Sequence, residues 1–197
     1  TIEAYLNDMD HPERGGLMLF LDMEKCFDRV AFDSLLRGMD VLGFGPRFLR
    51  SVRMMYDVDD PPQRRIYANG YYSSWFSVKS GVAQGCPLSP LLFLVIGQML
   101  KVSLGQNPWF RGIKIGERYV KASQFADDTT LYLGGPAELP HAEKQVVKWC
   151  KATGGRENVK KREGLACGKY RPDRGRRRRL PNGVKWVKQG EFAVVLG

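Results

Sequence analysis

The pattern of apolar and polar positions along the chain predicts a mixed α+β fold. Short continuous apolar runs are typical of buried strands, and apolar residues at helical spacing are typical of amphipathic helices. Strands are expected at residues 17–21, 112–115, 119–122, 123–126, 129–133, 184–188 and 192–196, and helices at residues 1–10, 32–42, 46–56, 91–104 and 141–151. A hairpin is expected at residues 64–78, because Asn69-Gly70 suits a turn with two positive φ angles. No internal repeat is present.

Charge divides the chain near residue 143. Residues 1–143 contain 15 Lys and Arg against 17 Asp and Glu, whereas residues 144–197 contain 16 against 4. The excess behind the net charge of +10 therefore lies in the last quarter, and it is densest at residues 171–179. A near-neutral body with a basic end suits a polyanionic partner, most simply nucleic acid, although a solvated basic loop without a partner is the alternative.

The composition argues against several classes of protein. The four cysteines form no C-x-x-C pair and the two histidines lie far apart, which disfavours zinc sites, disulfide frameworks and histidine-based hydrolases. A reducing intracellular setting is the default for such a chain. The longest apolar run, residues 91–96, falls well short of the roughly 20 residues of a membrane span, so no membrane is expected. The N-terminus has no signal-peptide features and is expected to be the edge of a longer protein.

Three carboxylates stand in unusual places. Asp127 and Asp128 are adjacent between two strand signals, and Asp22 directly follows the apolar run at residues 17–21. Adjacent carboxylates repel each other, but hard oxygen ligands of this kind suit Mg²⁺. If the strands lie side by side, the three carboxylates converge and can hold two ions ~4 Å apart. A polar turn is the simpler alternative for the Asp127-Asp128 pair alone.

Two further segments favour the metal site. In Asp-Met-Glu-Lys-Cys-Phe-Asp, Phe27 lies five positions after Asp22, and residues 81–90 form a Gly- and Pro-rich loop before a helix. Glycine lets backbone approach a flat ligand closely. A core phenylalanine and an ordinary helix-entry loop are the alternatives.

Three segments together resemble a known family. In chain order they are L-F-L-D-M-E-K-C-F-D-R-V, G-V-A-Q-G-C-P-L-S-P-L-L-F and F-A-D-D-T-T-L-Y-L. They resemble motifs A, B and C in the palm domain of reverse transcriptases, specifically those of non-LTR retrotransposons. The resemblance covers residues 17–133 and extends more weakly to residue 197. It implies an α+β palm, in which a small antiparallel sheet carries the catalytic carboxylates and helices pack on one face.

The resemblance also implies roles for individual residues. Asp22, Asp127 and Asp128 would be the catalytic carboxylates that hold two Mg²⁺ ions, with Mn²⁺ as a possible substitute. The backbone from Met23 to Cys26, which includes Lys25, would run beside the triphosphate of the incoming nucleotide. Phe27 matches the aromatic steric gate that excludes a 2′-hydroxyl, and Gln84 and Gly85 match the pair near the nascent base pair.

The basic end matches the family less closely. Lys161 fits the motif D lysine, a candidate general acid for pyrophosphate, and Arg162 stands where the family commonly has Thr or Ser. Trp186 begins a segment similar to the hairpin that grips the primer. The run Arg176, Arg177, Arg178 and Arg179 has no palm counterpart, so it is either an insertion that binds template backbone or drift in a decaying element.

The resemblance implies two parts and a set of partners. Residues 1–143 would be the palm with motifs A, B and C and partial fingers, and residues 144–197 its basic C-terminal part. Fingers, thumb and any endonuclease domain would lie outside the chain. The expected partners are an RNA template, a DNA primer and a dNTP, and the expected location is the nucleus. An inactive, truncated remnant that only binds nucleic acid is the alternative. A palm-type RNA polymerase is another, and Phe27 counts against it.

Overall fold

The computed structural model describes residues 2–8, 11, 14–125, 127–171 and 180–188. The chain forms two compact units, each discontinuous in sequence. The sheet unit consists of Thr1–Glu24, Leu100–Trp149 and Glu157–Gly197, and the helical unit of Lys25–Met99 and Cys150–Arg156. The unit boundaries fall within α4 (Ser89–Gln106) and α5 (Leu139–Thr153). The expected division at residue 143 rests on motifs and charge rather than on compactness, and it stays a prediction.

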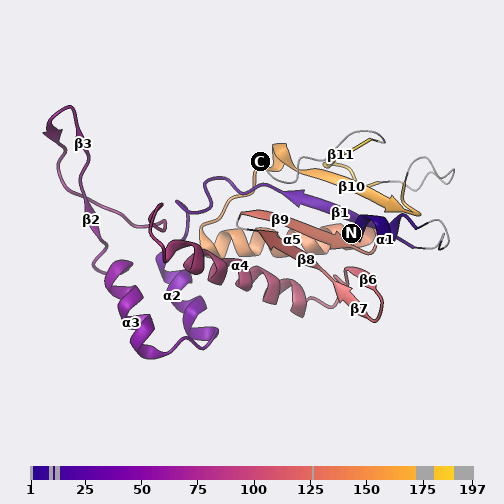
Figure 1. The fold of residues 1–197 in the computed structure, drawn as a ribbon, viewed down its shortest axis with the longest axis horizontal. Helices are drawn as coiled ribbons and strands as arrows, with labels where there is room; N and C mark the ends of the chain where they lie inside the picture. Colours follow the sequence, from indigo (N-terminus) through magenta and orange to yellow (C-terminus); the bar gives the residue numbers. More distant parts are fainter. Residues whose placement is uncertain (1, 9–10, 12–13, 126, 172–179, 189–197) are drawn as a thin grey trace. The chain divides into compact units, whose positions relative to one another are not determined.

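A five-stranded sheet forms the centre of the sheet unit, in the order β11-β10-β1-β9-β8 (Figure 1). The central strand β1 pairs antiparallel with both β10 and β9, and β11 runs parallel to β10. The strands are β1 (Gly15–Leu21), β8 (Ala122–Phe125), β9 (Asp128–Leu133), β10 (Glu163–Gly168) and β11 (Lys185–Trp186). The apolar run expected at residues 17–21 thus becomes the middle of the sheet, as a strand buried on both faces requires.

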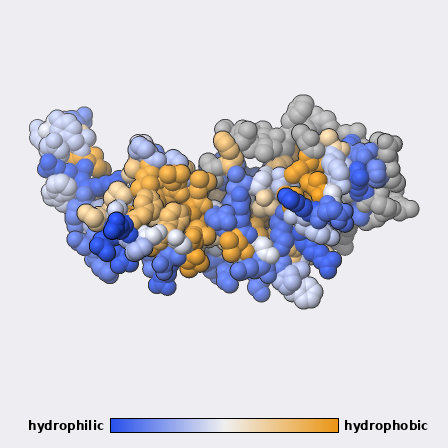
Figure 2. Space-filling view, turned by 60° about the horizontal axis from the view of Figure 1, so that its bottom comes forward, coloured by the Kyte–Doolittle hydropathy of each residue, from blue (hydrophilic) through white to orange (hydrophobic). Residues whose placement is uncertain are grey.

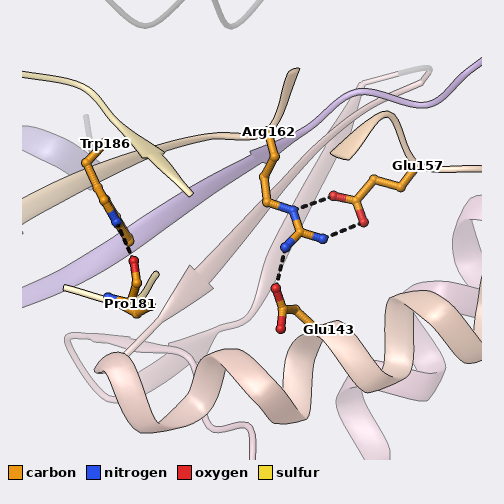
Figure 3. A network of polar contacts seen from close by, with 5 residues as sticks. All are labelled: Glu143, Glu157, Arg162, Pro181 and Trp186. Carbon is orange, nitrogen blue, oxygen red and sulfur yellow. Dashed lines mark hydrogen bonds and ion pairs between the residues drawn. The ribbon is translucent and has the colours of Figure 1, made fainter. Parts of the chain in front are cut away.

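Alternating side chains give the sheet two different faces. Leu17, Leu19 and Leu21 are buried on one face. Helix α5 lies along the sheet, where Glu143 bonds to Arg162 just before β10 (Figures 1 and 3). On the other face, Met18 packs in a cluster with α1 (Ile2–Leu6) and with the hairpin of β6 (Ile113–Ile115) and β7 (Arg118–Val120). A short helix therefore covers part of the second face as well.

The helical unit contains two amphipathic helices and an extended ribbon. Helices α2 (Phe32–Val41) and α3 (Pro46–Met55) match the expected segments, and their buried side chains include Leu35, Met39 and Val52. The ribbon, residues 63–77, consists of β2 (Gln63–Arg64), β3 (Tyr67–Ala68), β4 (Tyr71–Tyr72) and β5 (Phe76–Ser77). Asn69 and Gly70 have φ angles of 51° and 84°, so the expected hairpin turn is confirmed.

Helix α4 is longer than expected and nearly continuous in apolar character. Of the helices in the described residues, this one is long and apolar enough to cross a membrane, judged by length and composition alone. Core helices of globular proteins meet the same criterion, so a single such helix is weak evidence for a span. Leu92, Ile96 and Leu100 of α4 are almost fully buried, whereas Leu91 and Leu94 are exposed, so one side of the helix packs in the core.

Strand β10 is where the expected elements fell short. In the sequence this region shows only a short apolar piece at residues 165–167, whereas the strand has six residues and pairs with β1 from Gly15↔Gly168 to Phe20↔Glu163. The strand expected at residues 184–188 appears as the two residues of β11. The strand expected at residues 192–196 lies outside the described residues, together with most of the primer-grip-like segment.

Candidate active site

The register of β1 and β9 brings Asp22 next to the Asp127-Asp128 pair. Leu21 at the end of β1 pairs with Thr129 near the start of β9. Asp22 is the next residue after β1, and Asp128 is the first residue of β9, so the antiparallel register places them at the same edge. Phe125 pairs with Asp128 across the turn from β8, and this turn carries Asp127. The convergence expected from the sequence therefore follows from the strand pairing.

All three carboxylates line one cavity of about 530 Å³ in the sheet unit. Phe20 and Thr130, which pair between β1 and β9, line it together with lysine side chains. The lining residues are Phe20, Leu21, Asp22, Asp127, Asp128, Thr129, Thr130, Lys160, Lys161, Glu163 and Lys185. The cavity thus combines carboxylates with lysines, the residue types that hold a metal ion and a phosphate chain.

The negative charges of the three carboxylates are close enough to affect one another. Partial burial, and then the negative charges of Asp127 and Asp22, raise the pKa of Asp128 above its usual value. Lys161 lies close to the group, with its Nζ 3.5 Å from Oδ2 of Asp22. Lys185 similarly pairs with Glu163, at 2.6 Å. The three carboxylates concentrate negative charge, which the neighbouring lysines offset in part and which a bound cation would relieve further.

The donor set fits a hard divalent cation that keeps part of its water shell. Among the described residues, no three His, Cys, Asp or Glu side chains are gathered so that they could hold a metal ion by themselves. Mg²⁺ is usually bound through one or two carboxylates together with water and substrate phosphates, so a full protein cage is not required. Asp22, Asp127 and Asp128 are the residues that would hold such ions.

A strap of residues 157–162 crosses the end of β1 and holds Asp22 in place. The backbone of Glu157 forms a bridge with Met23, and the Asn158 amide donates to the Asp22 carbonyl at 2.9 Å. Helix η2 (Val159–Lys161) continues the strap to Lys161. The carboxylate and the lysine that face each other are therefore fixed by one short segment.

Arg162 anchors this strap through a buried ion-pair network (Figure 3). Its Nε donates to Oε1 of Glu157 at 2.7 Å, and its Nη2 donates to Oε2 at 2.8 Å. Nη1 donates to Oε1 of Glu143 on α5. Arg162 and Glu157 are only 9% and 7% exposed, and these bonds, led by those to Glu157, raise the pKa of Arg162. The sequence marked Arg162 only as a departure from motif D, and gave no sign of Glu157 or Glu143.

Comparison with known proteins identifies the family. The family described as "Reverse transcriptase (RNA-dependent DNA polymerase)" matches residues 2–190. The chain belongs to this reverse transcriptase family. It is 28% identical over 172 residues to the transposon TX1 uncharacterized 149 kDa protein of Xenopus laevis, and 28% identical over 160 residues to the Pol polyprotein of the type-1 retrotransposable element R2 of Popillia japonica. The expected membership among reverse transcriptases of non-LTR elements is confirmed.

These relatives are much longer than the chain. The matches cover 85% and 81% of the chain but only 13% and 22% of the two relatives. Among solved structures, the apo telomerase of Candida tropicalis matches 77% of the chain with a TM-score of 0.58. It shares 16% sequence identity, and the match covers 31% of that structure's chain. At this identity the likeness shows the fold, a reverse transcriptase and telomerase-like α+β arrangement.

The segments expected to be motifs A and B meet within the helical unit. The ring of Phe27 is half-buried and stacks on Phe93 of α4, with centroids 4.7 Å apart. Val82 donates to the Phe27 carbonyl at 2.8 Å, and Gln84 Nε2 donates to Oδ1 of Asp28 at 3.2 Å. Gly81 has a φ of +93°, and a Cβ there would lie 2.7 Å from the Asp28 carbonyl oxygen. The glycine therefore permits the close approach of the two motifs.

The remaining predicted site residues lie in varied surroundings. Met23 is buried beneath the strap, Lys25 is exposed with a φ of 46°, and Gly85 is exposed with a φ of +82°. The ring of Trp186 packs over Gly164, and its Nε1 donates to the Pro181 carbonyl at 2.9 Å (Figure 3). These contacts give Trp186 a packing role at the sheet edge, and its part in holding nucleic acid stays a prediction. Arg176, Arg177, Arg178 and Arg179 lie outside the described residues.

Proposed function

We propose that this chain is the palm of a reverse transcriptase that copies RNA into DNA. The reaction is attack of a primer 3′-hydroxyl on the α-phosphorus of a dNTP, with pyrophosphate leaving. One observation carries the proposal. Asp22, Asp127 and Asp128 come from two paired strands and line a single cavity, and Lys161 stands at its wall. Residues 1–143 would form the palm with partial fingers, and residues 144–197 its basic extension.

Each group in the cavity has a role in this chemistry. The three carboxylates would hold two Mg²⁺ ions, which Mn²⁺ can replace. When bound, the ions align the attacking hydroxyl and stabilise the leaving oxygen. Lys161 holds protons on Nζ beside Asp22 and can deliver one to the departing pyrophosphate. Lys160 and Lys185, which line the same cavity, can attract the phosphate chain.

The proposed partners follow from the reaction and from the charge of the chain. An RNA template and a DNA primer would occupy the surface above the cavity, and the run from Arg176 to Arg179 would contact template backbone. Fingers, thumb and an endonuclease domain belong to the proposal as parts of a longer polyprotein, consistent with the length of the relatives. A nuclear location belongs to it as well, because a retrotransposon copy must reach chromosomal DNA.

Primer extension on a poly(rA) template with an oligo(dT) primer, dTTP and Mg²⁺ tests this function. We expect extension by the parent chain and its loss in Asp22→Asn. Under this proposal most of the elements that clamp the triphosphate lie outside residues 1–197, so the isolated chain is expected to be weak or inactive, and a low rate is sufficient. Absence of any extension, with nucleic-acid binding retained, would contradict the proposal and favour the remnant that only binds.

The sugar preference provides a second, sharper readout. A flat ring at Phe27 would leave a 2′-hydroxyl without space or a hydrogen-bond partner, which costs about 1–3 kcal/mol, or roughly 5- to 150-fold in selectivity. We expect Phe27→Val to raise rNTP incorporation while dNTP incorporation falls only modestly. Phe93→Leu serves as the control, because it alters the ring behind Phe27 and leaves the gate itself present. An equal fall with both nucleotides would show that Phe27 is a packing residue.

A further inference from the structure

The ribbon exposes an unusual concentration of aromatic side chains. All residues from 63 to 77 are exposed, and they include Tyr67, Tyr71, Tyr72, Trp75 and Phe76. The exposed fractions reach 81% for Tyr71 and 61% for Trp75. Aromatic side chains bury large areas in most folds, and a short two-stranded hairpin gains little stability from leaving them in water. The exposed rings therefore indicate a ligand rather than a core.

The rings are held in a fixed arrangement before any ligand binds. The Asn69-Gly70 turn sets the pairing of Tyr67 with Tyr72, whose ring centroids lie 4.7 Å apart. The guanidinium carbon of Arg65 lies 3.8 Å from the centre of the Tyr72 ring and 4.8 Å from that of Trp75. Arginine stacking of this kind orders neighbouring rings and adds positive charge between them. Little side-chain entropy remains to be lost on binding.

The charged side chains in and beside the ribbon are all positive. Residues 61–80 contain Arg64, Arg65 and Lys79 and no Asp or Glu. Figure 2 shows the ribbon, found at the left as in Figure 1, coloured mostly from pale to deep blue, as expected for tyrosine, tryptophan and arginine. Among residues 63–77, the large aliphatic side chain that is exposed belongs to Ile66. Flat rings with interspersed cations suit a ligand that has flat bases and phosphates.

We propose that the ribbon binds single-stranded nucleic acid. Bases stack on the exposed faces of Tyr67, Tyr71 and Trp75, and phosphates pair with the positive charges of Arg64, Arg65 and Lys79. A duplex does not expose base faces for this stacking, and the segment offers few aliphatic side chains for the core of a protein interface. The identity of the strand as template RNA rests on the proposed function, whereas the stacking chemistry does not.

Fluorescence anisotropy with a labelled oligouridylate tests the ribbon in the full chain. Because each stacked base that loses its ring weakens binding by about 5- to 150-fold, we expect Tyr71→Ala with Trp75→Ala to lower the affinity at least tenfold. The two substitutions should leave the slope of log K against log salt unchanged, whereas Arg64→Gln with Arg65→Gln should reduce it by about 1 for each phosphate that is no longer neutralised. Tyr71→Phe with Trp75→Phe should restore the affinity, because both positions keep an aromatic ring.

A control variant and a mapping experiment complete the test. Tyr119→Ala removes an exposed aromatic residue of the sheet unit and should leave the affinity unchanged. An oligouridylate that carries 5-iodouridine should photo-crosslink to residues 63–77. Unchanged affinity in the ring variants, or crosslinks confined to residues 144–197, would overturn the proposal and leave a protein partner for the rings. If the parent chain crosslinks through residues 63–77 but shows no primer extension, the result would contradict the proposed function and leave the role of the ribbon intact.

Discussion

Asp128 is a carboxylate whose surroundings oppose its charge. Partial burial and the nearby Asp127 and Asp22 raise its pKa, so the folded protein binds this proton more tightly than the unfolded chain does. The contribution of such a group to stability is fully present at low pH. It is lost as the pH rises from the unfolded pKa through the raised folded pKa. At neutral pH the free protein therefore carries an electrostatic cost at this residue.

Asp128→Asn should stabilise the chain in the absence of divalent cations, because it removes repulsion worth up to about 1 kcal/mol. Urea denaturation at neutral pH measures the change. Added Mg²⁺ should stabilise the parent through binding to the folded state and stabilise the variant much less. The Mg²⁺ affinity of the parent should also fall as the pH is lowered toward the raised pKa, because the bound form is the carboxylate. An equal response of both proteins to Mg²⁺ would contradict a role of Asp128 in the metal site.

In contrast to Asp128, Arg162 is a buried charge that is stabilised by ion pairs with Glu157 and Glu143. Arg162→Ala should lower the free energy of unfolding by about 3–5 kcal/mol, because it leaves Glu157 buried without its partner. Glu143→Ala is the matched control, since Glu143 is 35% exposed and its loss should cost about 1 kcal/mol or less. Chemical denaturation followed by tryptophan fluorescence measures both. Equal effects would show that the Glu157 pair is not the anchor of the strap.

At the scale of whole elements, the sequence was most informative where one strand or helix carries its own pattern. Leu17 to Leu21 and the helix at residues 32–42 could be recognised because their apolar positions repeat with the period of the element. Strand β10 could not, since it contains Gly164 and Gly168 and owes its length to pairing with β1. The network of Arg162 was also hidden, because its acidic partner Glu143 lies on α5 and no local pattern links them.

The packing of β11 on β10 depends on a glycine, Gly164, which has no side chain. A Cβ at Gly164 would lie 2.7 Å from both the Trp186 ring and Val184. We expect Gly164→Ala to destabilise the sheet unit by about 1–3 kcal/mol through overpacking. Gly105→Ala is the control, because that glycine is exposed near the end of α4 with open space around it, and alanine favours a helix. Thermal unfolding should separate the two variants, and equal melting temperatures would show that Trp186 moves aside at little cost.

At the scale of the whole molecule, the carboxylates of the candidate site and most of the excess positive charge lie in different parts of the chain. The cavity combines Asp22, Asp127, Asp128 and Glu163 with three lysines, so its charge is nearly balanced. Most of the excess positive charge of the chain lies outside this cavity, in other parts of residues 144–197. It is densest in the arginine run. A catalytic surface that holds cations needs carboxylates, whereas attraction of a polyanion needs a separate basic surface. Under the proposed function, Asp22, Asp127 and Asp128 of the near-neutral body would meet the first requirement and the basic end the second.

The salt dependence of RNA binding tests whether the arginine run is that basic surface. Each phosphate neutralised by the protein releases condensed counterions, so the slope of log K against log salt reflects how many phosphates the protein neutralises. Arg176→Ala with Arg177→Ala should therefore reduce the slope by about 2, because each arginine would neutralise one phosphate. Lys144→Ala with Lys148→Ala removes the same charge from exposed positions on α5 and should change the slope far less. Equal slopes in the two double variants would show that the run acts only through the net charge of the molecule, and that no phosphate sits on these arginines.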